Sequence, residues 1–458
     1  MSAEKARRGD CREWRDDREV KVQLFMAGFL AFLFLLPVQG SAQIYNQTCQ
    51  SAEYARMVNR NAAADAADIT VYNPAGLVDL ADGYHLNVSN QIWIRRPTHT
   101  FTDPLGTGEL SYEQEGVDWI IPNLHAAYTH GDWAIFGAGY IPGGGAALDY
   151  PDGSFSTRAL GAGVIGPDGP AYIAYKDITD EFIEGSSLYI AYSIGGAYRI
   201  SDRLSIAAGI RTITVRNTIE GGLTLAEGWL GPLTPDMPLR VDVRETGQGW
   251  GGVFGIQVRP SEKLNIALHY ESRVRLDLET EIRSGDNVSE DAGLFRDGEK
   301  VRRDFPDMVG LGASYQFTPE FRAEVNFNYW FQEASDWGRS PDGKNISDLA
   351  GDSWSIGAAM AYQVLPKAEI SSGFLYTIYD WNDLDAYYNA NLGAIEVYYA
   401  DDVMFGLGFG YELIPGLIVN FGTGYILYVG ETVQTLVGDV DIENTSSAAF
   451  VLGIDYSF

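Results

Sequence analysis

The sequence is poor in cysteine and in basic residues, and each shortage excludes a class of protein. Only two of its 458 residues are cysteine, and Cys49 alone would remain after export processing, which leaves no intrachain disulfide. Lysine and arginine number 32 against 62 acidic residues, a formal net charge of −30. Nucleic acid is therefore not an expected partner, because its recognition needs basic patches.

Long apolar runs and catalytic motifs are also missing. After the N-terminal region no stretch approaches the 18 or so apolar residues of a transmembrane helix. The five histidines accompany no Gly-x-Ser-x-Gly motif, and no closely spaced histidine and cysteine set suggests a metal site. We therefore expect no enzyme activity, no cofactor and no bound metal.

The N-terminus has the features of an export signal. Leu24 to Leu36 is apolar apart from small residues, too short to cross a bilayer but typical of a signal h-region. Lys21 precedes it, and Gly40-Ser41-Ala42 follows as a cleavage site. Residues 1–42 are therefore predicted to be a signal peptide, with Gln43 as the mature N-terminus.

The segment from Met1 to Glu19 is long and charged for an n-region. A start at Val20 would give an ordinary signal peptide. We therefore expect that the gene model is too long and that the first 19 or so residues do not belong to the protein.

The chain ends in strict alternation of side chains. A strand of period 2 places its apolar residues on one face. That set comprises Ala448, Phe450, Leu452, Ile454, Tyr456 and Phe458. An alternating last strand with a terminal aromatic is typical of outer-membrane β-barrels, although the edge strand of a soluble sandwich could read the same way.

The same alternation recurs along the chain and decides between these alternatives. Asn265 to Ile282 is the longest run, beyond the usual length of a strand in a globular protein. Apolar residues facing outward and polar or small residues facing inward are typical of a barrel in lipid. The fold class is thus all-β, a fourteen-stranded antiparallel transmembrane barrel, with strands expected at 84–101, 117–129, 132–141, 186–199, 203–217, 247–258, 263–282, 306–317, 320–333, 352–365, 367–380, 401–413, 416–430 and 444–458.

Short and long connections alternate between these segments, as expected for periplasmic turns and extracellular loops. The longest loops are expected at 142–185 and 218–246. The predicted location is the outer membrane of a Gram-negative bacterium, with outer-membrane lipid and lipopolysaccharide as surroundings. We expect a monomer that reaches the barrel-assembly machinery through its C-terminal strand.

Two segments break the pattern. Apolar residues move from even to odd positions near Arg211-Thr212, and a β-bulge there would direct Arg211, Thr214 and Arg216 inward. Pro142-Gly143-Gly144 follows the third strand, where proline removes a ladder donor. That element either begins a loop or kinks the strand and opens the barrel wall.

Residues 43–83 precede the first strand and do not alternate, so they form either a periplasmic tail or a plug. Ala52 to Asp68 is rich in alanine and can be helical. The runs from Arg60 to Ala66 and from Asn73 to Leu77 resemble the N-terminal hatch of the FadL-type (FadL/TodX) outer-membrane transporters of long-chain fatty acids and aromatic hydrocarbons. Ile121 to His125 and Phe136 to Tyr140 resemble the second and third strands of that family.

The resemblance implies a hatch at 43–83 inside a barrel at 84–458. It also implies that a hydrophobic small molecule is captured at the outer loops, passed to a lumen pocket, and released sideways at a kinked third strand. Transfer would be passive. Candidate ligand-path residues in the hatch are Asn73, Pro74, Ala75 and Gly76, which could instead turn the chain against the wall.

Other ligand-binding candidates come from side-chain chemistry. Phe182, Trp229 and Leu230 lie in the long loops and could form a capture groove, or could pack as a cap. Inward arginines could anchor a carboxylate head group. The candidates are Arg211, Arg216, Arg273, Arg275 and Arg322. Arg273 and Arg275 lie among acidic residues in the sequence. The alternative to ligand binding is therefore that acidic side chains neutralise these arginines in a network inside the lumen.

Two other functions stay open from the sequence. A diffusion porin for small polar solutes would need an open lumen, which residues 43–83 disfavour. An adhesin or structural barrel would use its acidic loops to bind a host or neighbour. The residues do not choose between alkanoate, alkane and monoaromatic cargo.

The cleavage site yields a first testable prediction. N-terminal sequencing of protein from isolated outer membranes should begin at Gln43. Recovery of the protein in the soluble fraction, or with Leu24 to Leu36 still attached, would contradict the export assignment.

Overall fold

The computed structural model describes residues 51–458 apart from 167–168, 170, 173, 230–233, 284–293, 341–342, 392, 398 and 443–445. The predicted signal peptide, Gln43, Cys49 and Leu230 lie outside the described residues. Among the residues that are described, no helix has the length and apolar character needed to span a membrane.

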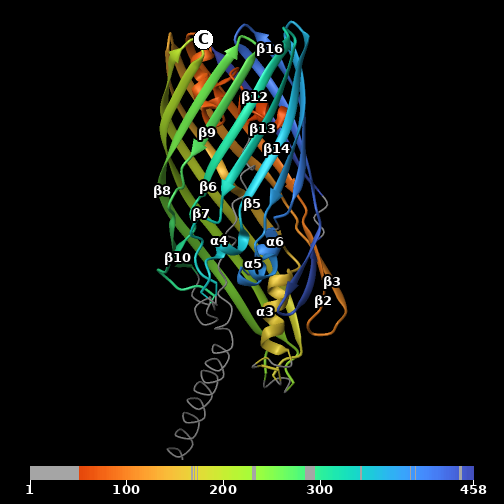
Figure 1. Cartoon of the computed structure of the whole chain (residues 1–458). Helices are drawn as coiled ribbons and strands as arrows, with labels where there is room; N and C mark the ends of the chain where they lie inside the picture. The colour runs from red at the N-terminus through yellow and green to blue at the C-terminus, as the bar shows by residue number, and fades with distance from the viewer. Residues whose placement is uncertain are drawn as a thin grey trace, which may run out of the picture.

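Fourteen antiparallel strands close into a barrel (Figure 1). Closure is made by pairing of the first strand with the last, as at Leu86 and Tyr456, and of β8 with β9, as at Ile256 and Leu268. The wall strands in chain order are β1 (Gly83–Arg95), β4 (Val117–His130), β5 (Trp133–Tyr150), β6 (Asp177–Ser201), β7 (Leu204–Ala226), β8 (Met237–Ser261), β9 (Leu264–Glu271), β12 (Asp307–Thr318), β13 (Phe321–Phe331), β14 (Ser353–Leu365), β15 (Ala368–Tyr379), β16 (Asp402–Ile414), β17 (Leu417–Tyr428) and β20 (Ser446–Ser457). Each of the fourteen predicted segments therefore contains a wall strand, although several bounds differ and the segment at 263–282 is interrupted after Glu271.

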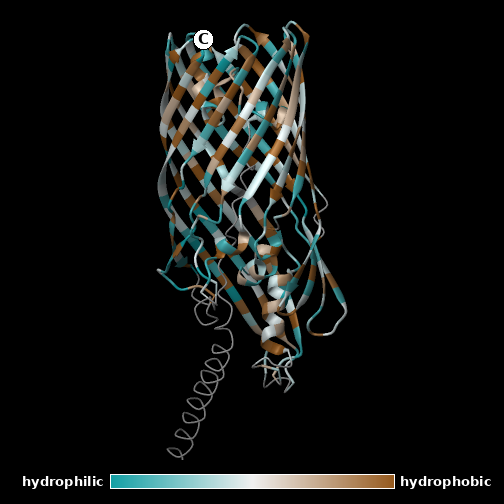
Figure 2. Cartoon of the chain, in the orientation of Figure 1, coloured by the Kyte–Doolittle hydropathy of each residue, from teal (hydrophilic) through white to brown (hydrophobic). Residues whose placement is uncertain are grey.

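The outer surface of the wall is apolar. Side chains such as Ile194, Phe254 and Leu407 are exposed on it, and brown bands follow the strands in Figure 2. Their neighbours along each strand are polar or small and face inward, as in β20, where alternate residues are buried and exposed. The C-terminus lies at the end with the short turns, opposite the helices (Figure 1).

The predicted loops at 142–185 and 218–246 are wrong in extent, because much of each is strand. β5 continues to Tyr150, and β6 and β8 are each 25 residues long. Outward residues near the outer ends of these strands are polar, as Arg216 and Gln248 are, so apolar alternation fades while the ladder continues. Apolar alternation occurs where the outward side chains contact lipid, and these strands extend beyond the lipid.

The remaining outer segments pack into a cap over the far end of the barrel (Figure 1). Four short strands form a second sheet and four short helices lie beside it. The cap has a core of its own that includes Phe101, Phe155, Trp337 and Tyr387. Its elements are β2 (Thr98–Thr102), β3 (Glu109–Glu113), β18 (Glu431–Thr435), β19 (Gly438–Ile442), α3 (Phe155–Ile165), α4 (Ile346–Ala350), α5 (Leu384–Ala390) and α6 (Ala394–Val397).

A buried ion-pair group ties α3 to the rest of the cap. The Arg158 guanidinium lies 2.8 Å from Asp103 and 3.1 Å from Glu181. Burial raises the pKa of Asp103, but hydrogen bonds from Arg158 and Thr107 outweigh burial and lower that pKa to about 2. Asp103 is therefore ionised near neutral pH, and its contribution to cap stability is lost only as the pH falls towards 2.

The predicted bulge at Arg211-Thr212 is wrong. β7 pairs without a register shift from Ser205 through that region, on both of its edges. The extra residue occurs instead after β9. From the pair Val253–Glu271 to the pair Thr246–Glu279, β8 advances seven residues and its partner eight. One extra residue reverses which side chains face inward.

That reversal breaks the predicted strand at 263–282 into two pieces. β9 ends at Glu271, Val274 makes an isolated bridge to Phe305, and β10 (Asp277–Ile282) follows, paired with β11 (Lys300–Arg302).

The C-terminal residue seals the barrel at its short-turn end. The Phe458 N–H donates to the carbonyl of Tyr84 at 3.0 Å, and the Tyr84 N–H donates to the carbonyl of Phe458 at 2.8 Å. The two rings stack with centroids 5.4 Å apart. Gly83 adopts φ +138°, and a Cβ there would lie 2.5 Å from the Phe458 carbonyl oxygen.

These contacts generate a prediction for assembly. Phe458→Ala should lower the amount of heat-modifiable barrel in the membrane, since it removes ring contacts worth about 1 kcal/mol at the seam. Phe458→Trp keeps an aromatic ring and serves as the control. Equal amounts of assembled protein for Phe458→Ala and the parent would contradict an assembly role.

Candidate functional site

The segment ahead of β1 lies inside the barrel, as predicted for a hatch, and appears red to orange within the wall in Figure 1. It contains α2 (Ala52–Met57) and two 3₁₀ turns, η1 (Ala67–Val71) and η2 (Pro74–Asp79). α2 contacts β14 to β17 and β20, whereas η2 contacts β4 to β8. The periplasmic-tail alternative is therefore wrong for the described residues.

Buried charges hold the hatch together and to the wall. Arg60 lies 2.7 Å from Asp65 and 2.6 Å from Asp68, and Asp65 also pairs with Arg322 of β13. Arg60 is fully buried. Removing one partner of such a group leaves an uncompensated buried charge, which costs several kcal/mol, on the order of 3–5.

A second polar group anchors α2. The side chain of Asn87 on β1 donates to Glu53 at 2.9 Å and to Asp455 at 2.8 Å. Asn420 on β17 donates to the same two carboxyl groups. A polar wall therefore faces a polar plug, and each satisfies the other's hydrogen bonds.

The Asn73 to Gly76 element fixes the turn of the hatch. The Asn73 side chain donates to the Ala63 carbonyl at 2.8 Å and to Gln257 of β8 at 2.6 Å. Pro74 opens η2, and Ser205 of β7 donates to the Ala75 carbonyl at 2.8 Å. A Cβ at Gly76 would lie 2.6 Å from the Asn73 amide. These contacts are structural, and a role of the four residues in a ligand path stays a prediction.

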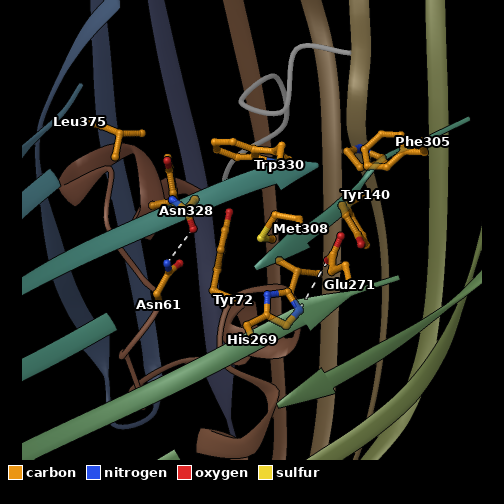
Figure 3. Close-up of a pocket in the computed structure, with 13 residues that line it drawn as sticks. Asn61, Tyr72, Tyr140, His269, Glu271, Phe305, Met308, Asn328, Trp330 and Leu375 are labelled. Carbon is orange, nitrogen blue, oxygen red and sulfur yellow. Dashed lines mark hydrogen bonds and ion pairs between the residues drawn. The ribbon is translucent and has the colours of Figure 1, made fainter. Parts of the chain in front are cut away.

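A cavity of about 90 Å³ lies between the hatch and the wall (Figure 3). The cavity is lined by side chains from the hatch and from β5, β9, β12, β13 and β15. Its apolar and aromatic lining includes Tyr54, Val71, Tyr72, Tyr140, Pro142, Phe305, Met308, Trp330 and Leu375. Its other lining residues are Asn61, His269, Glu271 and Asn328.

An apolar patch on the lumen wall adjoins this cavity through Tyr140 and Phe305. Polar lumen faces are the usual arrangement in such barrels, so this patch is a departure. Its members belong to β5, β6, β7 and the chain after β9. They are Ala138, Tyr140, Tyr189, Ala191, Ile213, Val215, Val274, Leu276, Leu278 and Phe305.

The patch accounts for the phase change in β7 and for the reversed orientation of the apolar residues after β9. Ile213 and Val215 shift phase because they face the lumen, not because the strand bulges. Val274, Leu276 and Leu278 continue the apparent alternation of β9 but lie on the opposite face. All five side chains are at most 1% exposed.

A charged group stands at one end of the cavity. Arg211 of β7 is fully buried and pairs with Glu271 of β9. Its guanidinium also lies 5.2 Å from the Phe305 ring centroid, within the range of a cation–π contact. The His269 Nε2 lies 3.6 Å from Glu271 Oε1 (Figure 3).

The five predicted arginines divide between the two faces of the wall. Arg211 and Arg322 face the lumen, and each is paired with a carboxylate. The inward placement of Arg216, Arg273 and Arg275 is wrong. Arg216 is exposed because β7 has no bulge, and the side chains of Arg273 and Arg275 are 41% and 70% exposed because the extra residue after Glu271 turns them outward.

Pro142-Gly143-Gly144 lies within β5 and does not begin a loop, whereas an opening of the wall at this element stays a prediction. β5 runs through the element, with register shifts against β6 between Tyr140 and Gly143 and again after Gly144. Gly144 adopts φ +65°, and a Cβ there would meet the Ser187 carbonyl oxygen at 2.4 Å. The element thus depends on glycine.

The ladder between β4 and β5 ends at this element. Its pairs run from His130–Trp133 to Leu124–Gly139. Further out the two chains are joined again by side chains, since Asp118 accepts a hydrogen bond from the Ala147 N–H at 2.9 Å. Pro142 lines the cavity between these two points.

The outer-loop candidates lie apart from the cavity. Phe182 is half-buried, with the Arg240 guanidinium 5.1 Å from its ring centroid. Trp229 is 61% exposed, with Lys176 Nζ 4.6 Å from its ring. No cluster of His, Cys, Asp or Glu able to hold a metal ion occurs among the described residues.

Sequence reasoning missed the cavity residues His269, Glu271, Phe305 and Trp330. The available signal was the change of apolar phase in the segment 203–217, which marks an apolar lumen face when no bulge accompanies it.

Comparisons with known proteins agree with this architecture. The model of the family described as outer membrane protein transport protein (OMPP1/FadL/TodX) matches residues 37–458. Outer membrane protein P1 of Haemophilus influenzae is 22% identical over 337 residues, which are 67% of this chain and 66% of that protein.

Solved structures show the same fold. A FadL homologue from Pseudomonas aeruginosa superposes with a TM-score of 0.63 at 12% identity, over 91% of this chain and 100% of its own. The toluene transporter TodX of P. putida gives 0.59 at 13% identity, over 87% and 96% of the two chains.

The buried hatch yields a prediction on conductance. Deleting residues 43–70 should produce large, steady single-channel currents, because a fourteen-stranded barrel is too wide for its own side chains to fill. Replacing Pro74 and Gly76 by alanine should give the same effect more weakly. If the deletion leaves a heat-modifiable barrel with unchanged conductance, residues 43–70 do not block the pore.

Proposed function

Because the chain belongs to the OMPP1/FadL/TodX family of outer-membrane transport proteins for hydrophobic compounds, we propose that it takes up long-chain fatty acids or aromatic or aliphatic hydrocarbons passively. In this proposal, cargo is captured at the outer cap, occupies the lumen cavity, and leaves sideways through the wall at β5. The supporting observation is that one cavity is bounded by the hatch, the aromatic residues and Pro142 of the kinked strand.

The route has a clear physical basis. The saccharide layer of lipopolysaccharide is polar and obstructs direct partition of apolar solutes into the membrane. A protein path lined by apolar surface crosses that layer, since each Å² of apolar surface kept out of water is worth about 25 cal/mol. Lateral release then delivers the cargo to lipid instead of to the periplasmic solution.

The kink supports a sideways exit between β4 and β5. The ladder stops at Gly139, and proline at position 142 offers no backbone N–H for a ladder bond. Trp119 and Ile120 on the adjoining part of β4 are 66% and 78% exposed, so this part of the wall presents apolar surface outward.

Entry from outside would begin at the cap. Trp229 is the exposed aromatic candidate for capture, and Phe182 is partly covered by Arg240. Leu230 stays a candidate from its sequence position. We propose lipid contact through the apolar outer band, lipopolysaccharide contact around the polar outer ends of β6 to β8, and a monomeric barrel.

The contacts of the hatch disfavour the porin alternative. A diffusion porin conducts through a water-filled lumen, whereas here buried ion pairs and side-chain hydrogen bonds join the hatch to β1, β8, β13 and β17. The adhesin alternative does not account for an apolar patch inside the barrel.

The proposed exit generates a prediction on uptake. Cells lacking their own transporters and expressing this protein should take up radiolabelled oleate or toluene, and Pro142→Ala should reduce that uptake several-fold because it allows a straighter, fully paired β5. Pro366→Ala, in the turn between β14 and β15, is the matched control. Full uptake by Pro142→Ala would place the exit elsewhere, and absence of uptake by the parent would contradict transport of these compounds.

A further inference from the structure

The polar residues at one end of the lumen cavity indicate the chemical class of its cargo, which the fold alone does not. Most of the lining is apolar or aromatic, but His269 and Glu271 stand side by side at one end, near Phe305 and Tyr140 (Figure 3). Both side chains are under 10% exposed. A purely apolar cargo would contact these groups without offering them a hydrogen bond.

The two asparagine side chains of the cavity already have partners. Asn61 donates to Asn328 at 2.7 Å, and Asn328 donates to Ser355 at 3.1 Å. Nε2 of His269, in contrast, has no hydrogen-bond partner among the described residues, although it is buried. A buried polar atom without a partner costs about 1–3 kcal/mol, so a ligand that bonds it gains affinity.

The charge of the site argues against a carboxylate. Arg211 is the cation at this end of the cavity, and Glu271 neutralises it directly. The second Arg211 contact is to the Ser272 carbonyl at 3.2 Å. A ligand carboxylate would have to approach Glu271, a like charge, or displace it from Arg211, and either is unfavourable in a dry site.

We propose that this cavity selects a neutral hydrophobic compound, on the order of one ring in size, that carries a hydroxyl group. A hydroxyl both donates and accepts. When Nε2 of His269 carries the proton, the hydroxyl accepts from Nε2–H and donates to Glu271 Oε1; in the other tautomer of the imidazole the hydroxyl donates to Nε2 instead. The aromatic and aliphatic lining takes the rest of the molecule. This inference rests on the proposed transport function and names its substrate class.

The size of the cavity agrees with a small cargo. About 90 Å³ is less than the ~150 Å³ of an engineered cavity that binds benzene. A single ring therefore needs modest movement of lining side chains such as Met308, whose thioether chain adapts readily. A long acyl chain needs much more space at this position.

The test compares three ligands of one shape on the full-length mature protein in lipid nanodiscs. Equilibrium binding of toluene, 4-methylphenol and 4-methylbenzoate is measured, with empty nanodiscs subtracted. We expect 4-methylphenol to bind about tenfold more tightly than toluene, because a hydrogen bond to a charged group has roughly that value. We expect 4-methylbenzoate to bind most weakly.

Variants assign the preference to the named residues. His269→Phe should reduce the preference for 4-methylphenol over toluene while retaining toluene binding, because the hydroxyl loses its bond to Nε2 and keeps the one to Glu271. His125→Phe removes another buried lumen histidine that does not line the cavity, and it should keep the preference. Glu271→Gln frees the charge of Arg211 and should raise the affinity for 4-methylbenzoate.

Each outcome separates this inference from the proposed function. Equal binding of toluene and 4-methylphenol by the parent protein, or preference for 4-methylbenzoate, would overturn the hydroxyl inference and leave hydrophobic transport intact. A smaller preference in His269→Phe, with heat-modifiability retained, supports the hydroxyl inference, and an unchanged preference would also overturn it. Binding of none of the three ligands, together with no cellular uptake of oleate or toluene, would remove the proposed function itself.

Discussion

A backbone in lipid must pair its own N–H and C=O groups, and the rest of this structure depends on that constraint. The wall meets it by closing β1 on β20 and β8 on β9. The ladder is interrupted next to Pro142, where β5 shifts register against β6 and ends its pairing with β4. An interruption of this kind in a membrane wall needs local compensation, which Asp118 provides by accepting the Ala147 N–H.

Closure of the barrel leaves a lumen that is too wide for the side chains of the wall to fill. The hatch fills it with backbone turns whose polar groups are satisfied by the wall, through Asn87, Gln257 and Asn420. The buried Arg60 of the hatch is paired with Asp65 and Asp68. The cavity lies between the hatch and the wall and adjoins the apolar patch through Tyr140 and Phe305, so polar and apolar surfaces meet where cargo would bind.

Much of the fold could be predicted from the sequence, because period-2 alternation reports contact with lipid directly. The strand segments and the hatch followed from local pattern. The lumen did not, because the rule that apolar residues face outward assumes a polar interior. Ile213 and Leu276 break that assumption, and the faces of Arg216 and Arg275 were assigned wrongly for the same reason. The pairing register of the strands decides which of these side chains face the lumen, and period-2 alternation does not encode that register.

We propose above all that hydrophobic cargo occupies the cavity beside Pro142 of β5. A crystal structure of the protein soaked with 4-bromotoluene, with bromine located by its anomalous signal, tests that claim most directly. The account predicts a bromine peak among Phe305, Trp330 and Pro142. Bromine confined to the outer cap or to the lipid-facing surface, with the cavity empty, would contradict it.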